Sequence, residues 1–254
     1  MLENTSSGMP RIAQKEIDTG TLSGEPWRGV SPPRGSEIHL WRGELTRLAE
    51  KAGPLRRTLS SNERERCARL RSSRDRWRWS LGRGALRHVL SRYLGSAPER
   101  LVFRYGEAGK PCLADHCQLQ FNLSNSGELV VIAVTSGVPV GVDVERLRPL
   151  SHMDGIARRW FTEAEYRAIR RVSSPHRKTR LFFEVWTQEE ARVKATGDGL
   201  RHLKAGAGSA RPLVPSVWPL EPAPGFVGAV ALNRKSELEP EHLNDIGSNR
   251  MRSR

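Results

Sequence analysis

The pattern of apolar and polar positions predicts two long helices in this 254-residue chain. Apolar residues recur at helical spacing from Arg76 to Leu94 and stop at Gly95, which indicates a helix that faces the core. A second helical pattern covers residues 177–196 and ends at Gly197, a residue type that commonly follows a helix end. Shorter helices are predicted at about 152–159 and 163–171.

Strand patterns lie between these helices and beyond them. The alternating segment "SEIHLWR", Ser36 to Arg42, predicts a first strand. The segment "SGVP" has the residues of a turn, which predicts that the strands on either side of it pair antiparallel. This order of elements predicts an α+β fold rather than a doubly wound parallel sheet. The remaining strands are predicted at 101–104, 119–123, 128–135, 138–145 and 226–232.

The two ends of the chain lack such periodicity. Residues 1–35 are rich in Ser, Gly and Pro, and residues 234–254 are polar, so we expect a disordered leader and a disordered tail. The leader lacks the apolar core of a secretory signal, and no apolar stretch has the length of a membrane span. We therefore expect a cytoplasmic protein with no membrane partner.

The three cysteines argue against a disulfide framework. Cys112, His116 and Cys117 lie close together in the sequence, but their spacing is a poor template for a structural zinc site. The cysteine content therefore adds no candidate chemistry.

Positive charge is concentrated in one part of the chain. The net charge is +14, from 42 Lys and Arg against 28 Asp and Glu, and 14 arginines face four acids between Arg56 and Arg104. Such a field attracts polyanions: nucleic acid, an acidic protein or a phosphorylated cofactor. An arginine-rich protein with solvated helix faces has the same composition, so charge alone does not choose between these hypotheses.

Three acids and a lysine are the candidates for chemistry. Asp143 and Glu145, in "VGVDVE", point to one face of a predicted strand, where like charges repel unless a cation, water or a proton separates them. Glu190 and Lys194 lie one helical turn apart and would, on their own, form an ordinary surface ion pair. Two carboxylates from a strand and one from a helix suit Mg²⁺, which prefers carboxylates together with water and phosphate.

Several motifs occur together and in order between residues 36 and 232. They are "GKP", "FNLSNSG", "VGVDVE", "RWFTEAEY" and the spaced pattern W-T-x-x-E-A-x-x-K that leads into "ATGDGL". In this combination the chain resembles the surfactin-type (Sfp-like) 4′-phosphopantetheinyl transferases. The resemblance implies two similar α+β halves in one chain, 36–137 and 138–233, with the cofactor cleft between them.

The resemblance also implies a reaction and its partners. The enzyme would transfer 4′-phosphopantetheine from coenzyme A to a serine of an apo acyl or peptidyl carrier protein. The reaction would depend on Mg²⁺ and release adenosine 3′,5′-bisphosphate. The implied partners are coenzyme A and an acidic helical carrier domain, which a positive surface would steer towards the enzyme. A monomer is expected.

Site residues follow from the matched motifs. Asp143, Glu145 and Glu190 match the metal-binding acids, and Glu190 also matches the base that takes the proton from the carrier serine. Lys194 matches the lysine beside the phosphates. For coenzyme A, the matching residues are Arg66, Arg78, Lys110, Pro111, Ser124, Asn125 and Lys194.

Three departures from the family pattern leave alternatives open. Asn125 stands where the family usually has His, and Glu189 stands where it usually has Lys. The segment 201–217 is shorter than usual, so one edge strand of the second half is in question. A degenerate member that binds carrier or coenzyme A without efficient transfer is one alternative. A basic nucleic-acid-binding protein is another, but it explains only the charge and has no recognisable nucleic-acid-binding motif.

Overall fold

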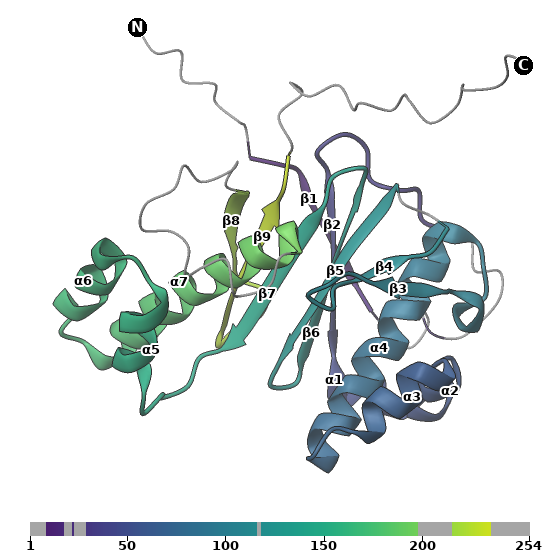
Figure 1. Cartoon of the computed structure of the whole chain (residues 1–254), viewed down its shortest axis with the longest axis horizontal. Helices are drawn as coiled ribbons and strands as arrows, with labels where there is room; N and C mark the ends of the chain where they lie inside the picture. The colour runs from purple at the N-terminus through teal and green to yellow at the C-terminus, as the bar shows by residue number, and fades with distance from the viewer. Residues whose placement is uncertain (1–8, 18–21, 23–28, 116–117, 198–214, 235–254) are drawn as a thin grey trace, which may run out of the picture.

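The computed structural model has an α+β fold, as predicted. It describes residues 9–17, 22, 29–115, 118–197 and 215–234. Two sheets pack against each other, and a 22-residue helix covers the outer face of each sheet. Figure 1 shows one long helix on each side of the two sheets. Residues 235–254 of the predicted tail, and residues 1–8, 18–21 and 23–28 of the predicted leader, lie outside the described residues.

The first sheet has four strands in the order β1-β2-β6-β5. β6 is antiparallel to both of its neighbours, whereas β1 is parallel to β2. The bounds are β1 Ile12–Glu16, β2 Ile38–Glu44, β5 Leu119–Ser126 and β6 Leu129–Ser136.

The second sheet has three strands in the order β7-β9-β8, and both pairs are antiparallel. A separate two-stranded ribbon pairs β3 with β4. The bounds are β7 Val140–Arg146, β8 Ser216–Leu220 and β9 Phe226–Leu232, with β3 Phe103–Tyr105 and β4 Pro111–Leu113 in the ribbon.

The long helices are α4, Ser73–Leu94, and α7, Pro175–Thr196. Each ends at a glycine with positive φ, Gly95 at 63° and Gly197 at 81°, a conformation in which glycine has no steric penalty. The other helices are α1 Leu45–Leu48, α2 Ala52–Arg57, α3 Ser61–Ala68, α5 Met153–Trp160 and α6 Glu163–Arg171.

β6 explains why the sheets form two inner layers. Its residues alternate between faces: Val130, Ile132 and Val134 pack in the core under α4, and the odd-numbered residues pack against β7 and β9 of the second sheet. A strand buried on both faces has a continuous apolar sequence, as β6 does. The outer face of the second sheet packs against Ala191 and Ala195 of α7.

Two predictions from the sequence are wrong. β6 and β7 do not pair with each other, because both edges of β6 are already occupied, by β2 and β5, and β7 pairs with β9. The predicted leader of residues 1–35 contains β1. This strand gains its backbone hydrogen bonds from β2 although its own sequence is only weakly apolar.

The edge strand in question is present. β8 begins at Ser216, inside the shortened segment, and pairs with β9; residues 198–214 lie outside the described part of the chain. Each long helix therefore covers one sheet: α4 covers the mixed four-stranded sheet, and α7 covers the antiparallel three-stranded sheet. The division into halves at residues 137 and 138 stays a prediction. None of the described helices combines the length and apolar character needed to cross a bilayer.

The arginine-rich region is only partly a surface field. Arg83 and Arg87 are buried in α4, and both donate to the buried carboxylate of Glu63 from α3. These two positive charges are used inside the molecule. They are unavailable to an external polyanion, so the arginine count overstates the basic surface.

We expect Trp186→Ala to lower the free energy of unfolding by about 2 kcal/mol. Trp186 stacks on Phe182 with ring centroids 6.4 Å apart, but it is only half-buried, so the loss should fall below the roughly 3–5 kcal/mol of a fully buried aromatic ring. Urea unfolding measures the change. Unchanged stability with lost activity would instead place Trp186 in the cleft.

Candidate functional site

The candidate site lies where α7 packs directly on β7. Asp143 and Glu145 occupy the face of β7 that meets α7, and Glu190 and Lys194 belong to α7. Gly141 permits this approach. A Cβ atom there would overlap the backbone of Ala191 and Ala195 and lie 2.9 Å from the carbonyl carbon of Lys194. The glycine thus brings the residues of the strand and the helix together.

Asp143 is the central acid of this junction. It is 4% exposed, and its Oδ1 accepts hydrogen bonds from Lys194 Nζ at 2.6 Å and from Ser124 Oγ at 2.8 Å. Its Oδ2 is buried and has no hydrogen-bond partner. Because buried carboxylate oxygens normally have partners, this oxygen is available to a ligand.

Glu145 and Glu190 share an electrostatic environment with Asp143. Burial raises the pKa of Glu190, and the charges of Asp143 and Glu145 raise it further, whereas Lys194 lowers it. Burial also raises the pKa of Glu145; Ser126, which donates to Glu145 Oε2 at 2.6 Å, acts in the opposite direction. The charge of Asp143 thus raises the pKa of both glutamates, as expected for carboxylates that lie close together.

The chemistry of these acids fits a divalent cation, although their oxygens do not converge on one point in this conformation. Within the described ranges no group of three or more His, Cys, Asp or Glu is placed to hold a metal ion. Lys194 already provides a positive charge at Asp143. The unpartnered Asp143 Oδ2 and the mutual repulsion of three oxygen-donor side chains suit Mg²⁺. Of the three residues considered for zinc, Cys112 is exposed and forms no disulfide, and His116 and Cys117 lie outside the described residues.

A pocket of about 580 Å³ adjoins Glu145. Asn125, Ser126 and Glu145 form part of its lining, and α4 contributes Arg78. Arginine guanidinium groups are well suited to phosphate groups. The arginines of the lining are Arg74, Arg78, Arg146 and Arg148.

Two of the residues matched to coenzyme A have other partners. Arg78 lines this pocket, and its guanidinium group donates a hydrogen bond of 3.1 Å to the carboxylate of Glu128. Arg66 lies over the ring of Tyr105, 5.5 Å from its centroid. No described contact joins Arg66 or Pro111 to the three acids.

Lys110 is turned into the protein. Its Nζ donates to the carbonyl oxygens of Val140 at 3.0 Å and Ala195 at 3.3 Å, and burial lowers its pKa to about 8. These bonds connect the start of β7 to the last turn of α7. The lysine of "GKP" therefore holds the strand and the helix together in this conformation.

Glu189 forms an ion pair with Arg192 one turn along α7. The side chain of Glu189 is 14% exposed. The negative charge that departs from the family pattern is therefore neutralised within the same helix.

Sequence reasoning missed Asn122, Ser126, Arg146 and Arg148. Asn122 and Ser126 share the face of β5 that carries Ser124. A signal was present: polar side chains at every second position of a strand that is otherwise largely buried. Arg146 and Arg148 follow the acid-bearing strand and line the pocket.

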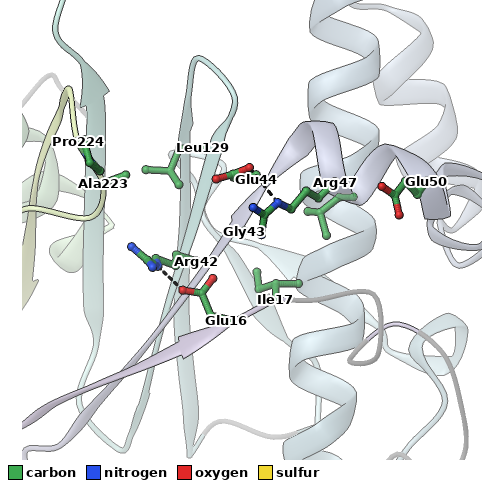
Figure 2. Close-up of a pocket in the computed structure, with 11 residues that line it drawn as sticks. Glu16, Ile17, Arg42, Gly43, Glu44, Arg47, Glu50, Leu129, Ala223 and Pro224 are labelled. Carbon is green, nitrogen blue, oxygen red and sulfur yellow. Dashed lines mark hydrogen bonds and ion pairs between the residues drawn. The ribbon is translucent and has the colours of Figure 1, made fainter.

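A second pocket, of about 640 Å³, does not involve these residues. Figure 2 shows that its charges pair with one another: Arg42 with Glu16, and Arg47 with Glu44. It contains none of the predicted site residues. The pocket beside Glu145 contains predicted site residues and four arginines, so it is the better candidate for a phosphorylated ligand.

Comparison with known proteins identifies the family of this chain. Residues 139–209 match the 4′-phosphopantetheinyl transferase superfamily, and residues 50–137 match the 4′-phosphopantetheinyl transferase N-terminal family. The chain is 40% identical over 171 residues to the 4′-phosphopantetheinyl transferase HetI of Nostoc sp. strain PCC 7120, covering 66% of this chain and 72% of HetI. The chain belongs to the 4′-phosphopantetheinyl transferase family.

Other relatives in this family come from different bacteria. Identity is 34% over 142 residues to Sfp of Bacillus subtilis strain 168, covering 56% of this chain and 62% of Sfp. It is 36% over 122 residues to AcpT of Escherichia coli K12, covering 48% of this chain and 58% of AcpT. The chain thus spans less than two thirds of these two transferases. The matches show the family and do not separate Sfp-like specificity from that of other members.

Proposed function

We propose that this enzyme transfers 4′-phosphopantetheine from coenzyme A to a serine of an apo acyl or peptidyl carrier protein, releasing adenosine 3′,5′-bisphosphate. One observation carries the proposal: Asp143, Glu145, Glu190 and Lys194 meet beside an arginine-lined pocket. Phosphoryl transfer requires positioning and neutralisation of charge more than covalent participation. The family membership supports the same reaction.

Each group at the junction has a proposed role. Asp143, Glu145 and Glu190 would hold Mg²⁺, which when bound supplies positive charge to the pyrophosphate of coenzyme A. Glu190 takes the proton of the carrier serine, a task that its raised pKa favours. Lys194 neutralises charge that develops on the leaving phosphate.

The pocket arginines and Asn125 would bind the phosphates of coenzyme A. Asn125 is exposed at the pocket and can donate a hydrogen bond to a phosphate oxygen, although it supplies no charge. We propose Arg66, Arg78 and Pro111 as further coenzyme A residues on the strength of the motifs. For Lys110 a role in joining β7 to α7 is better supported.

The test uses the purified protein, coenzyme A, Mg²⁺ and several apo-carrier proteins. A carrier that gains the mass of phosphopantetheine, read by mass spectrometry, supports the proposal and identifies a partner. Tight carrier binding without a gain in mass would favour the degenerate alternative. A salt-sensitive gel shift without coenzyme A binding would favour a nucleic-acid-binding protein. The cytoplasmic location and the monomeric state remain predictions.

The ion pair at Glu189 argues against the degenerate alternative and yields a prediction. We expect Glu189→Lys to change the KM for coenzyme A by less than about twofold, because Glu189 is already neutralised by Arg192. Stability should fall by up to about 1 kcal/mol, since two like charges then lie three residues apart. The double variant Glu189→Lys/Arg192→Glu should recover that loss. Much tighter coenzyme A binding in Glu189→Lys would show that residue 189 faces the ligand.

A further inference from the structure

Side chains of β5 form the hydrogen bonds between the two sheets at the site. β5 and β7 belong to different sheets and lie side by side (Figure 1). Asn122 Oδ1 accepts from the backbone N–H of Val142 at 2.9 Å, and Ser124 Oγ accepts from that of Val144 at 3.3 Å. Ser126 Oγ accepts from the N–H of Arg146 at 3.1 Å.

These three bonds repeat with a fixed offset of 20 residues, so β5 and β7 run in the same direction at this seam. Alternate residues of a strand share a face, and alternate N–H groups share an edge. Three polar side chains at every second position of β5 therefore match three successive N–H groups on one edge of β7. We call Asn122, Ser124 and Ser126 the β5 seam.

Two members of the seam have a second bond, and the third does not. While accepting from β7, Ser124 donates to Asp143 Oδ1 at 2.8 Å and Ser126 donates to Glu145 Oε2 at 2.6 Å. A hydroxyl group can accept and donate at once. An amide oxygen such as Asn122 Oδ1 can only accept. The two serines thus reach the very carboxylates that the proposed function uses, and Asn122 does not.

We infer that Ser124 and Ser126 are positioning residues that orient the Asp143 and Glu145 carboxylates by joining each of them to the backbone of its own strand. Each hydroxyl occupies one carboxylate oxygen and leaves the other oxygen for a ligand. At Asp143 the remaining oxygen is the buried, unpartnered Oδ2. The inference rests on the proposed function for the identity of that ligand.

This inference changes the role of Ser124. The motif matched it to a phosphate contact, yet Ser124 is 6% exposed and its hydroxyl is shared among Asp143, the Val144 amide and Lys194. A hydroxyl with these partners is better placed to hold the acid than to bind a phosphate. Ser126 is half-buried and beside the pocket, so it is the cleaner position to test.

The chain offers a matched control for the seam. Ser126→Ala removes one seam bond and one carboxylate bond, Asn122→Ala removes one seam bond only, and Ser126→Thr keeps the hydroxyl group. Full-length protein with each substitution is titrated with Mn²⁺ as the probe, by electron paramagnetic resonance, and its melting temperature is recorded.

We expect Ser126→Ala to weaken Mn²⁺ binding about tenfold, the usual loss when a residue that orients a metal ligand is removed. Asn122→Ala should lower the melting temperature and leave Mn²⁺ affinity within about twofold, and Ser126→Thr should bind like the wild type. Equal weakening in Ser126→Ala and Asn122→Ala would overturn the inference, because the serine would then act only through the seam. Unchanged affinity in Ser126→Ala would overturn it as well.

A second measurement separates this inference from the proposed function. Wild-type protein that neither binds Mn²⁺ nor modifies a carrier would refute the proposed function. The rotamer of Glu145, read from its methylene couplings by NMR, tests the positioning role without a metal. A single rotamer in the wild type and in Asn122→Ala, but averaging in Ser126→Ala, supports the role; the same couplings in all three proteins overturn it.

Discussion

Asp143→Asn is expected to lower carrier modification at least about 100-fold, which is typical of losing one preorganised charge at a reacting centre. Asparagine keeps the size of the side chain, and its oxygen can still accept from Ser124. It removes the negative charge that faces Lys194 and the anionic oxygen that would bind Mg²⁺. Initial rates at saturating coenzyme A and Mg²⁺ measure the loss. The exposed Asp154→Asn, on α5, provides the same chemical change away from the junction.

Stability decides how a loss of activity is interpreted. The side chain of Lys194 is 28% exposed, so losing its partner leaves an ammonium group that water still reaches. We therefore expect the near-UV circular dichroism and the melting temperature of Asp143→Asn to stay close to those of the wild type. An unfolded variant would mean that Asp143 is a structural acid, and full activity would remove it from the site.

Gly141→Ala is expected to destabilise the protein by about 3 kcal/mol or more and to abolish transfer, because the added methyl group overlaps the backbone of α7. Neither the strand nor the helix backbone can yield without repacking. Any displacement of α7 also separates Glu190 and Lys194 from Asp143. Urea unfolding and carrier modification measure the two effects.

Gly155→Ala is the control for this substitution. Gly155 lies in α5 with no atom within 4 Å of the position of a Cβ, so alanine there should stabilise by about 0.5–1 kcal/mol through its higher helix propensity. If Gly141→Ala were as stable and active as the wild type, the tight approach of β7 and α7 would not hold in solution.

Helices and strands with a clear periodic pattern of apolar residues were predictable from the sequence. β9 has the predicted bounds, 226–232, and α4 and α7 end at the predicted glycines. β1 was missed because its place in the sheet depends on hydrogen bonds to β2, and its own sequence has only a weak strand pattern. The pairing of β6 with β7 was wrong because turn residues specify a local reversal and not the neighbours that already occupy the edges of a strand.

In the candidate site, too, relations within one helix or strand were predictable and contacts made by packing were not. The sequence placed Asp143 and Glu145 on one strand face and Glu190 one turn from Lys194, because those relations depend only on local periodicity. The direction of Lys110 and the partner of Glu189 depend on how β7 and α7 pack, which no local pattern contains. The bonds from Ser126 to Glu145 and to the Arg146 amide require two sheets to meet, so only the structure revealed them.

The β5 seam has a consequence for how this enzyme can diverge. An ordinary sheet is joined by peptide groups, which every sequence provides, so substitutions rarely change which strands are neighbours. Here the hydrogen bonds between β5 and β7 come from three side chains, Asn122, Ser124 and Ser126. A point mutation at one of them alters the fit between the sheets while the backbone ladder of each sheet stays intact. A single substitution at the β5 seam can therefore change the geometry of the site that β5 and β7 share.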